Sequence, residues 1–188
     1  MEFVKYKISD LATVTAGGDR PSIVSDVKTN ETPSPIFSNG VENEGLYGYT
    51  DRAKIDGDTV TITGRGVNVG TVCYRDEAFM PIVRLLSLIP KRELVDAKYL
   101  YYLLKNITLT GTGSAQPQIT IPMISNQDVV ICKDLILQKK IAKFLSVYDD
   151  KIKINKRINN NLADQVQAIY CNAYDPIMHA PSGILSDI

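Results

Sequence analysis

A long segment without helix breakers is the feature that most constrains this chain. Residues 138–174 contain neither glycine nor proline, so nothing in them interrupts a helix. Core-forming positions recur along this segment at alternating steps of four and three: Ile141, Leu145, Tyr148, Ile152, Asn155, Asn159, Leu162, Val166, Ile169 and Ala173. This seam is typical of a helix that packs along its length against another helix. At 1.5 Å per residue the helix would be roughly 50 Å long; the alternative is an amphipathic helix that lies on its own domain.

The centre of the seam is polar. Asn155 and Asn159 occupy successive core positions, and a buried Asn fixes register because it pairs well with another Asn and poorly with an aliphatic side chain. In an antiparallel pair of helices Asn155 would meet Asn159, and Ile152 would meet Leu162. A parallel pair matches equally well, so the seam predicts assembly without choosing a direction.

The charge distribution gives the globular part no general affinity for nucleic acid. The 188 residues carry 21 basic and 21 acidic side chains. Residues 1–137 hold 14 Lys/Arg and 16 Asp/Glu, a balance of minus two, whereas residues 138–174 hold seven and three, a balance of plus four. Nucleic-acid binders usually carry a basic domain. Any role in DNA binding must therefore depend on local clustering of cations.

Cysteine usage and hydropathy predict a cytoplasmic protein. Cys73, Cys132 and Cys171 are isolated and odd in number, which argues against a disulfide framework or a cysteine metal site. No apolar run approaches the length of a membrane span, and the first residues lack an apolar signal region. We therefore expect a reducing environment and no membrane partner.

Motifs for catalysis are missing. The glycine loop at residues 64–70 reads GxGxxxG, which is neither the dinucleotide fingerprint nor a P-loop. The one histidine, His179, is near the C-terminus, so a serine or cysteine nucleophile has no obvious base. We predict a protein that is not an enzyme and that holds neither a cofactor nor a metal.

The remaining patterns predict an α+β fold, in which a globular domain of short mixed strands with small helices precedes a long C-terminal coiled-coil helix. We expect helices at residues 7–14 and 97–105, the second capped by Asp96. Strands are predicted at residues 35–37, 46–50, 59–63, 71–74, 80–88 and 129–131. The predicted organisation is a domain at 1–134, a spacer or dimerisation helix at 135–175 and a tail at 176–188.

Four stretches together resemble a specificity subunit of a type I restriction-modification system. They are KISDLATVTAGGDRPS, VTITGRGVNVGTVCY, GSAQPQIT and QKKIAKFLSVYDDKIKINKRINNNL. The last two, in that order and close together, are the most specific. GGDRPS departs from the usual glycine-glycine-threonine-proline form of the family. The resemblance covers roughly residues 5–174.

The resemblance implies a noncatalytic target recognition domain followed by a conserved spacer helix. In the family, a full subunit carries two such halves with antiparallel spacer helices. Each recognition domain reads one part of a bipartite DNA target, and methyltransferase (modification) subunits lie on each side, with a nuclease in the full complex. This chain resembles one half, so we expect either a half-subunit that forms an antiparallel homodimer or a truncated subunit. The alternative function is a noncatalytic protein-interaction adaptor that dimerises through the helix.

DNA reading requires donors, acceptors and cations on loops that reach a groove. Arg65 lies between glycines at a strand end and suits a guanine edge or a phosphate, while the amides of Gln116 and Gln118 suit adenine edges. The alternative is a structural role for each candidate: in a turn for Arg65 and Asn68, at a solvated strand end for Gln116 and Gln118, and unspecified for the others. The predicted DNA-binding residues are Arg20, Ser38, Asn39, Thr63, Arg65, Asn68, Ser114, Gln116 and Gln118.

Overall fold

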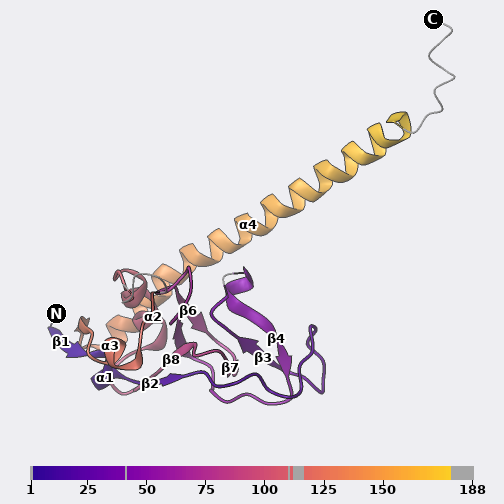
Figure 1. The fold of residues 1–188 in the computed structure, drawn as a ribbon. Coiled ribbons are helices and arrows are strands. Elements are labelled where there is room, and N and C mark those ends of the chain that lie inside the picture. Colours follow the sequence, from indigo (N-terminus) through magenta and orange to yellow (C-terminus); the bar gives the residue numbers. More distant parts are fainter. Residues whose placement is uncertain (1, 41, 110, 112–116, 179–188) are drawn as a thin grey trace, which may run out of the picture. The chain divides into compact units, whose positions relative to one another are not determined.

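The computed structural model describes residues 2–40, 42–109, 111 and 117–178, with side chains through Cys171 (Figure 1). Its strands are β1 (Phe3–Lys7), β2 (Ala12–Ala16), β3 (Ser34–Phe37), β4 (Leu46–Thr50), β5 (Thr59–Ile62), β6 (Val72–Arg75), β7 (Met80–Pro81), β8 (Leu86–Pro90) and β9 (Asp128–Cys132). Its helices are α1 (Ile8–Leu11), the 3-10 helix η1 (Glu42–Gly45), α2 (Ala97–Lys105), α3 (Ile121–Ser125) and α4 (Leu135–Met178). These elements confirm the α+β class and the long C-terminal helix.

The strands form small, separate sheets. One sheet has the order β2-β8-β5-β6 with antiparallel neighbours. A second has the order β4-β3-β7, in which β3 pairs antiparallel with β4 and parallel with β7. The N-terminal strand β1 forms a two-stranded ribbon with β9. Antiparallel pairs of such short strands expose many loops, and loops are where binding residues concentrate.

The main hydrophobic core lies between the first sheet and the helices around it. Strands β5 and β8 contribute Val60, Ile62 and Leu88, and α2 contributes Leu100 and Leu104, all fully buried. The start of α2 follows the prediction, because the carboxylate of Asp96 accepts a 3.0 Å hydrogen bond from the backbone N–H of Tyr99. Helix α2 packs against β5 and β6 of the first sheet. Strand β5, Thr59–Ile62, is the strand that its β-branched residues predict most clearly.

Two predicted elements were wrong. The helix expected at residues 7–14 is confined to Ile8–Leu11, and the chain then enters β2. Thr13, Val14 and Thr15 favour a strand, and pairing with β8 overrides the helical spacing. The single strand expected at residues 80–88 is divided into β7 and β8, because Val83 and Arg84 adopt left-handed backbone conformations, with φ of 52° and 59°.

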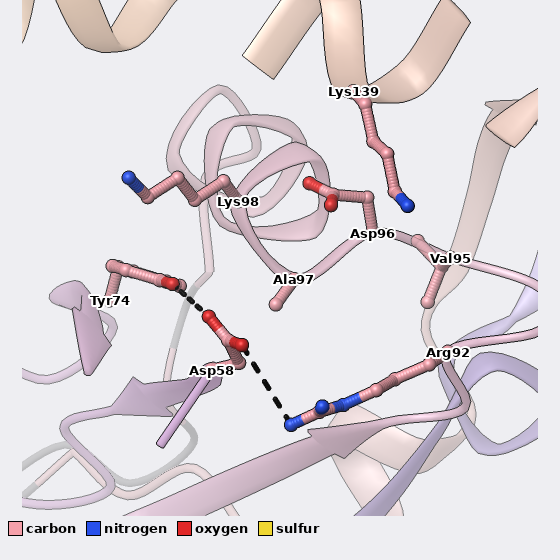
Figure 2. Close-up of a pocket in the computed structure, with 8 residues that line it drawn as sticks. All are labelled: Asp58, Tyr74, Arg92, Val95, Asp96, Ala97, Lys98 and Lys139. Carbon is pink, nitrogen blue, oxygen red and sulfur yellow. Dashed lines mark hydrogen bonds and ion pairs between the residues drawn. The ribbon is translucent and has the colours of Figure 1, made fainter. Parts of the chain in front are cut away.

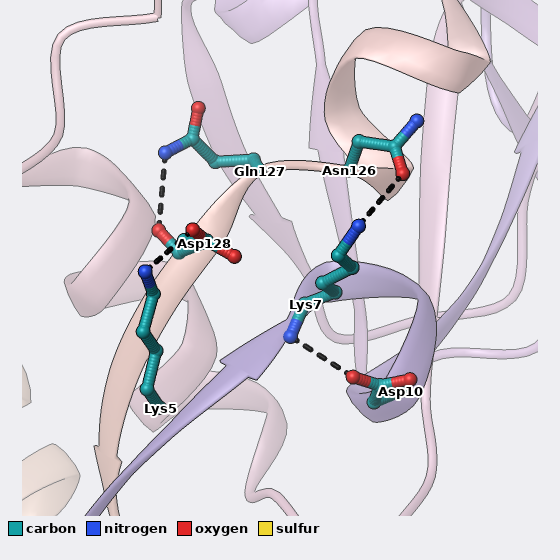
Figure 3. Close-up of polar contacts among 6 residues, drawn as sticks. All are labelled: Lys5, Lys7, Asp10, Asn126, Gln127 and Asp128. Atoms are coloured by element: carbon teal, nitrogen blue, oxygen red, sulfur yellow. Dashed lines mark hydrogen bonds and ion pairs between the residues drawn. The ribbon is translucent and has the colours of Figure 1, made fainter.

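The β1–β9 ribbon, which the sequence did not indicate as a pair, is fixed by polar contacts at one end (Figure 3). The Lys5 ammonium lies 2.7 Å from the Asp128 carboxylate, and the Lys7 ammonium donates to the side-chain oxygen of Asn126 at 3.3 Å. The Lys7 backbone N–H donates to Asp10 at 3.0 Å, which links the ribbon to α1. The hydrogen bond from the Lys5 ammonium, together with its positive charge, holds the pKa of Asp128 below its ordinary value.

A buried arginine connects the two larger sheets. Arg75 at the end of β6 donates from Nε to the Thr61 hydroxyl at 3.0 Å and from Nη2 to the Glu44 carbonyl at 2.7 Å. Its guanidinium carbon lies 3.7 Å from the centroid of the Phe37 ring on β3. Burial lowers the pKa of Arg75, and the nearby Cys73 and Glu44 partly offset this effect. The charge is therefore satisfied inside the protein and serves the fold.

The chain divides into two compact units, Met1–Lys143 and Phe144–Ile188, and the boundary falls within α4. The first turns of α4 belong to the globular unit, where Gln138 and Ala142 are buried and Ile141 packs against the core. The boundary predicted from the sequence, between residues 134 and 135, coincides with the start of α4 and not with the division between the two units. At the other end α4 includes Pro176 and is described as far as Met178. The rest of the predicted tail, residues 179–188, lies outside the described residues.

Gln138 is the polar centre of this junction. Its side-chain nitrogen donates to the carbonyls of Cys132 at 2.7 Å and Leu94 at 3.1 Å, and its oxygen accepts from the Asp96 N–H at 2.8 Å. One buried amide thus satisfies backbone groups from the end of β9 and from the segment before α2.

Replacing Gln138 with Leu should destabilise the globular unit by roughly 2 kcal/mol or more, because the buried Cys132 carbonyl and two partly buried backbone groups lose their partner, at about 1–3 kcal/mol for a fully buried group. Urea unfolding followed by near-ultraviolet circular dichroism of the tyrosines would measure this loss. Lys140→Leu, an exposed change on the same helix, is the matched control and should shift stability by no more than about 0.5 kcal/mol. Equal unfolding midpoints for the two variants would contradict the role of Gln138.

Candidate nucleic-acid interface

Two of the predicted DNA-binding residues, Arg65 and Gln118, lie side by side although they are far apart in the sequence. Their backbones form an isolated antiparallel bridge, and Nη2 of Arg65 donates to the side-chain oxygen of Gln118 at 3.2 Å. The bridge is continued by the Ile119 N–H, which donates to the Gly64 carbonyl at 2.9 Å. The contact leaves other donors of the Arg65 guanidinium and the amide group of Gln118 for a ligand.

Gly64 allows three segments to approach one another at this point. A Cβ atom on Gly64 would lie 3.2 Å from the Arg84 carbonyl oxygen and 3.3 Å from the Ile119 carbonyl oxygen. A side chain at position 64 would therefore require these neighbours to shift by a few tenths of an ångström. The glycine that precedes Arg65 thus keeps the loop in contact with both the 83–84 turn and the 118–119 segment.

Asn39 fastens the same loops together from the other side. Its side-chain oxygen accepts a 3.0 Å hydrogen bond from the Gly64 N–H, and its nitrogen donates to the Val83 carbonyl. Both ends of the amide are thus engaged with backbone. The structure places Asn39 as a support for the loops that carry Arg65 and Arg84.

A cleft of about 250 Å³ lies where these segments meet. Its polar rim includes Arg65, Arg84 and Gln118, and its remaining lining comes from Ala16, Gly64, Leu86, Ile119, Thr120, Ile121 and Pro122. Sequence reasoning missed Arg84, because residues 80–88 read as one buried strand. The available signal was a single charged residue inside that apolar run.

The other candidates lie in different surroundings. Thr63 is buried, and its backbone pairs with Gly70 and Thr71 across the glycine loop. Ser38 Oγ accepts a long hydrogen bond from the Gly40 N–H at 3.4 Å. The carbonyl of Asn68 accepts from Thr71, while Val67, which sequence reasoning did not consider, is 99% exposed beside it. Arg20 stacks over the Tyr47 ring at 5.3 Å, and Ser114 and Gln116 lie outside the described residues.

A second pocket, of about 360 Å³, lies near the start of α2 (Figure 2). Its charged groups largely satisfy one another: the Tyr74 hydroxyl donates to Asp58, whose carboxylate lies 3.8 Å from Arg92. The Lys98 ammonium lies 5.2 Å from the centroid of the Tyr74 ring. Burial, followed by the bond to Asp58, raises the pKa of Tyr74 above its ordinary value. The carboxylates of Asp58 and Asp96 line this pocket together with its cations, whereas the described residues that line the Arg65 cleft include no carboxylate.

The described residues contain neither a metal-binding cluster nor a membrane-spanning helix. In the ranges given above, no group of three or more His, Cys, Asp or Glu side chains is placed to hold a metal ion. No helix within those ranges is both long enough and apolar enough to cross a membrane.

Comparison with known proteins places this architecture in a family. Residues 1–164 match the model of the family named type I restriction modification DNA specificity domain. A type I specificity subunit of Mycoplasma pneumoniae is 32% identical over 141 residues, which are 74% of this chain and 41% of the relative. A second one from the same organism is 31% identical over 145 residues, covering 77% of this chain and 39% of the relative. The chain thus spans about two fifths of the length of these curated relatives.

Solved structures share the fold. The crystal structure of the type I restriction-modification S subunit from M. genitalium superposes with a TM-score of 0.70 at 22% identity, covering 88% of this chain and 44% of that one. The HsdS subunit from Thermoanaerobacter tengcongensis gives a TM-score of 0.53 at 16% identity, with coverages of 82% and 39%. Taken with the family match over residues 1–164, these likenesses show that the chain belongs to the family of type I restriction-modification DNA specificity domains.

Proposed function

We propose that the globular unit binds duplex DNA and recognises one part of a bipartite target for a type I restriction-modification complex. The observation that carries this proposal is the Arg65–Gln118 pair at the rim of the cleft. An arginine suits the O6 and N7 acceptors of guanine, and a glutamine suits the N6 and N7 groups of adenine. The chain itself supplies recognition, and catalysis resides in partner subunits.

The zero net charge of the chain is compatible with this role if affinity comes from a local set of cations. Arg65 and Arg84 line the same cleft, and none of the described residues that line it with them is acidic. The first test is selection from a pool of random duplexes by the full chain, alone and with a methyltransferase subunit of its system. Enrichment of one sequence supports the proposal, and recovery of an unenriched pool contradicts it.

Arg65→Ala should weaken binding to the selected duplex by about 1–3 kcal/mol, or roughly 5- to 150-fold, because a base contact is lost. Fluorescence anisotropy at fixed ionic strength measures the effect. Arg52→Ala removes the same charge from an exposed loop position outside the cleft and is the matched control. Equal affinity of Arg65→Ala and wild type would remove Arg65 from the interface.

We further propose that α4 pairs with the helix of a second copy in antiparallel orientation. From Tyr148 to Ile169, the apolar seam residues are exposed in the single chain, including Ile152 at 51%. Isolated aliphatic stripes of this length are unfavourable in water, and a second seam would cover them. The antiparallel direction comes from the family, and the pairing of Asn155 with Asn159 is compatible with it.

A second apolar stripe on α4 offers a surface for a further partner. Val147, Ile154 and Ile158 are exposed and follow one another at steps of seven and four. At 100° per residue, Ile154 lies roughly 100° around the helix axis from the seam position Asn155. A helix that covers the seam would leave Val147 and Ile154 largely uncovered. We assign the seam to the second copy and the stripe of Val147, Ile154 and Ile158 to a methyltransferase subunit.

Two lysine substitutions separate these surfaces. Ile152→Lys should convert a dimer at micromolar concentration into a monomer, because it places a charge in the seam. Ile154→Lys, the same change on the same helix but roughly 100° from the seam position Asn155, should keep the dimer and lose the methyltransferase subunit. Analytical ultracentrifugation of each variant, with and without that subunit, measures both outcomes. A monomeric wild-type chain, or identical behaviour of the two variants, would contradict the assignment.

The asparagines at the centre of the seam give a separate prediction. Replacing Asn155 and Asn159 together by Leu should raise the melting temperature of α4 while allowing additional oligomeric states, because buried Asn trades stability for register. Circular dichroism and sedimentation equilibrium report the two properties. If neither changes, the asparagines do not face a partner helix.

The balance of minus two over residues 1–137 favours a second candidate, an adaptor that binds protein through α4 and does not bind DNA. Salt dependence distinguishes the two functions. Phosphate contacts release counterions and give a steep loss of affinity as salt rises. Absence of DNA binding at low salt, with dimerisation retained, would favour the adaptor.

A further inference from the structure

The turn between β7 and β8 has an unusual backbone. Val83 and Arg84 both have positive φ, 52° and 59°, and the Leu85 N–H donates to the Ile82 carbonyl at 3.0 Å to close the turn. Tight turns with two left-handed residues strongly prefer Asn-Gly or similar pairs. Positive φ is a genuine outlier for a β-branched residue such as Val83. Val83 and Arg84 are therefore unfavourable residues for this turn, whereas Asn and Gly would adopt its backbone conformation with less strain.

The surrounding structure fixes this turn firmly. The N–H groups of Val83 and Arg84 donate to the carbonyls of Gly18 at 2.9 Å and Gly17 at 3.1 Å. Gly17 lies so close that a Cβ there would come within 2.7 Å of the Pro81 carbonyl carbon. The Asn39 amide donates to the Val83 carbonyl from another side. A turn held by three separate contacts maintains its conformation against its own residue preferences.

The Arg84 side chain is not part of the network that holds the turn. It is exposed, lines the cleft beside Arg65 and Gln118, and makes no hydrogen bond or ion pair with any residue that the structure describes. Arg75, by contrast, is buried and engaged on several sides. The strained backbone thus positions the Arg84 guanidinium, which makes no hydrogen bond or ion pair with the residues that the structure describes.

We propose that Arg84 is a specificity-determining residue that donates to the edge of a guanine in the DNA target. This inference rests on the proposed function, namely that the globular unit binds duplex DNA. A phosphate accepts hydrogen bonds from a lysine or arginine at many surface positions. A base edge requires the planar fork of a guanidinium at one place and orientation. The rigid turn holds Arg84 at one place and in one orientation, despite its unfavourable φ, as a contact with a base edge requires.

Arg84→Gly separates stability from recognition. Glycine accepts positive φ without strain, so the melting temperature should rise by about 2–4 °C. Affinity for the duplex selected by the wild-type chain should fall roughly 5- to 150-fold. Arg92→Ala, at the opposite end of β8, removes the same charge from an exposed site outside the cleft and should change affinity little. A lower melting temperature, or unchanged affinity, would overturn the inference.

Arg84→Lys separates a base contact from a phosphate contact. If Arg84 reads guanine, the lysine variant keeps the slope of affinity against salt but selects duplexes with relaxed preference at one position. If the variant selects the same sequence as the wild type with the same affinity, the contact is to phosphate and the inference is wrong. Failure of the wild-type chain to select any sequence would instead refute the proposed function, so the two failures are distinguishable.

Discussion

The three hydrogen bonds of Gln138 attach the first turns of α4 to the rest of the globular unit. Its amide satisfies Cys132, Leu94 and Asp96, so the last strand, the segment before α2 and the start of α4 share one buried polar group. Such a group is costly to leave unpaired, which makes the junction specific as well as stable. The first turns of α4 are consequently part of the domain core, with Ala142 also buried. A helix that begins inside a core is a suitable base for an assembly element.

The candidate interface is organised by a similar use of an amide. Asn39 joins the glycine loop to the 83–84 turn, as Gln138 joins three segments at the junction. In both places a side chain satisfies backbone groups that no strand pairing reaches, and short loops gain fixed positions without a continuous sheet. Arg65 and Arg84 differ from Asn39 in the number of hydrogen-bond donors that they leave available to a ligand. The supporting residue is fully engaged, while the arginines present donors to the cleft.

Local patterns predicted the parts of the fold that local interactions determine. The Asp96 cap, the β-branched strand at Thr59–Ile62 and the uninterrupted α4 are of this kind. Tertiary pairing overrode the pattern at β2, and the turn at Val83 and Arg84 could not be predicted because neither residue favours positive φ. Among the candidate residues, the Arg65–Gln118 contact joins two independently chosen positions. The supporting role of Asn39 depends on distant backbone atoms, which no sequence pattern reveals.

The arrangement of half-sites in the selected DNA tests the central claim most directly, because it reports on base recognition and on helix pairing together. Two identical domains related by an antiparallel pair of helices should select two inverted copies of one half-site, separated by a constant number of base pairs. Inserting about five base pairs, half a turn of DNA, should abolish tight binding. A single half-site, or two half-sites that tolerate any separation, would contradict the account.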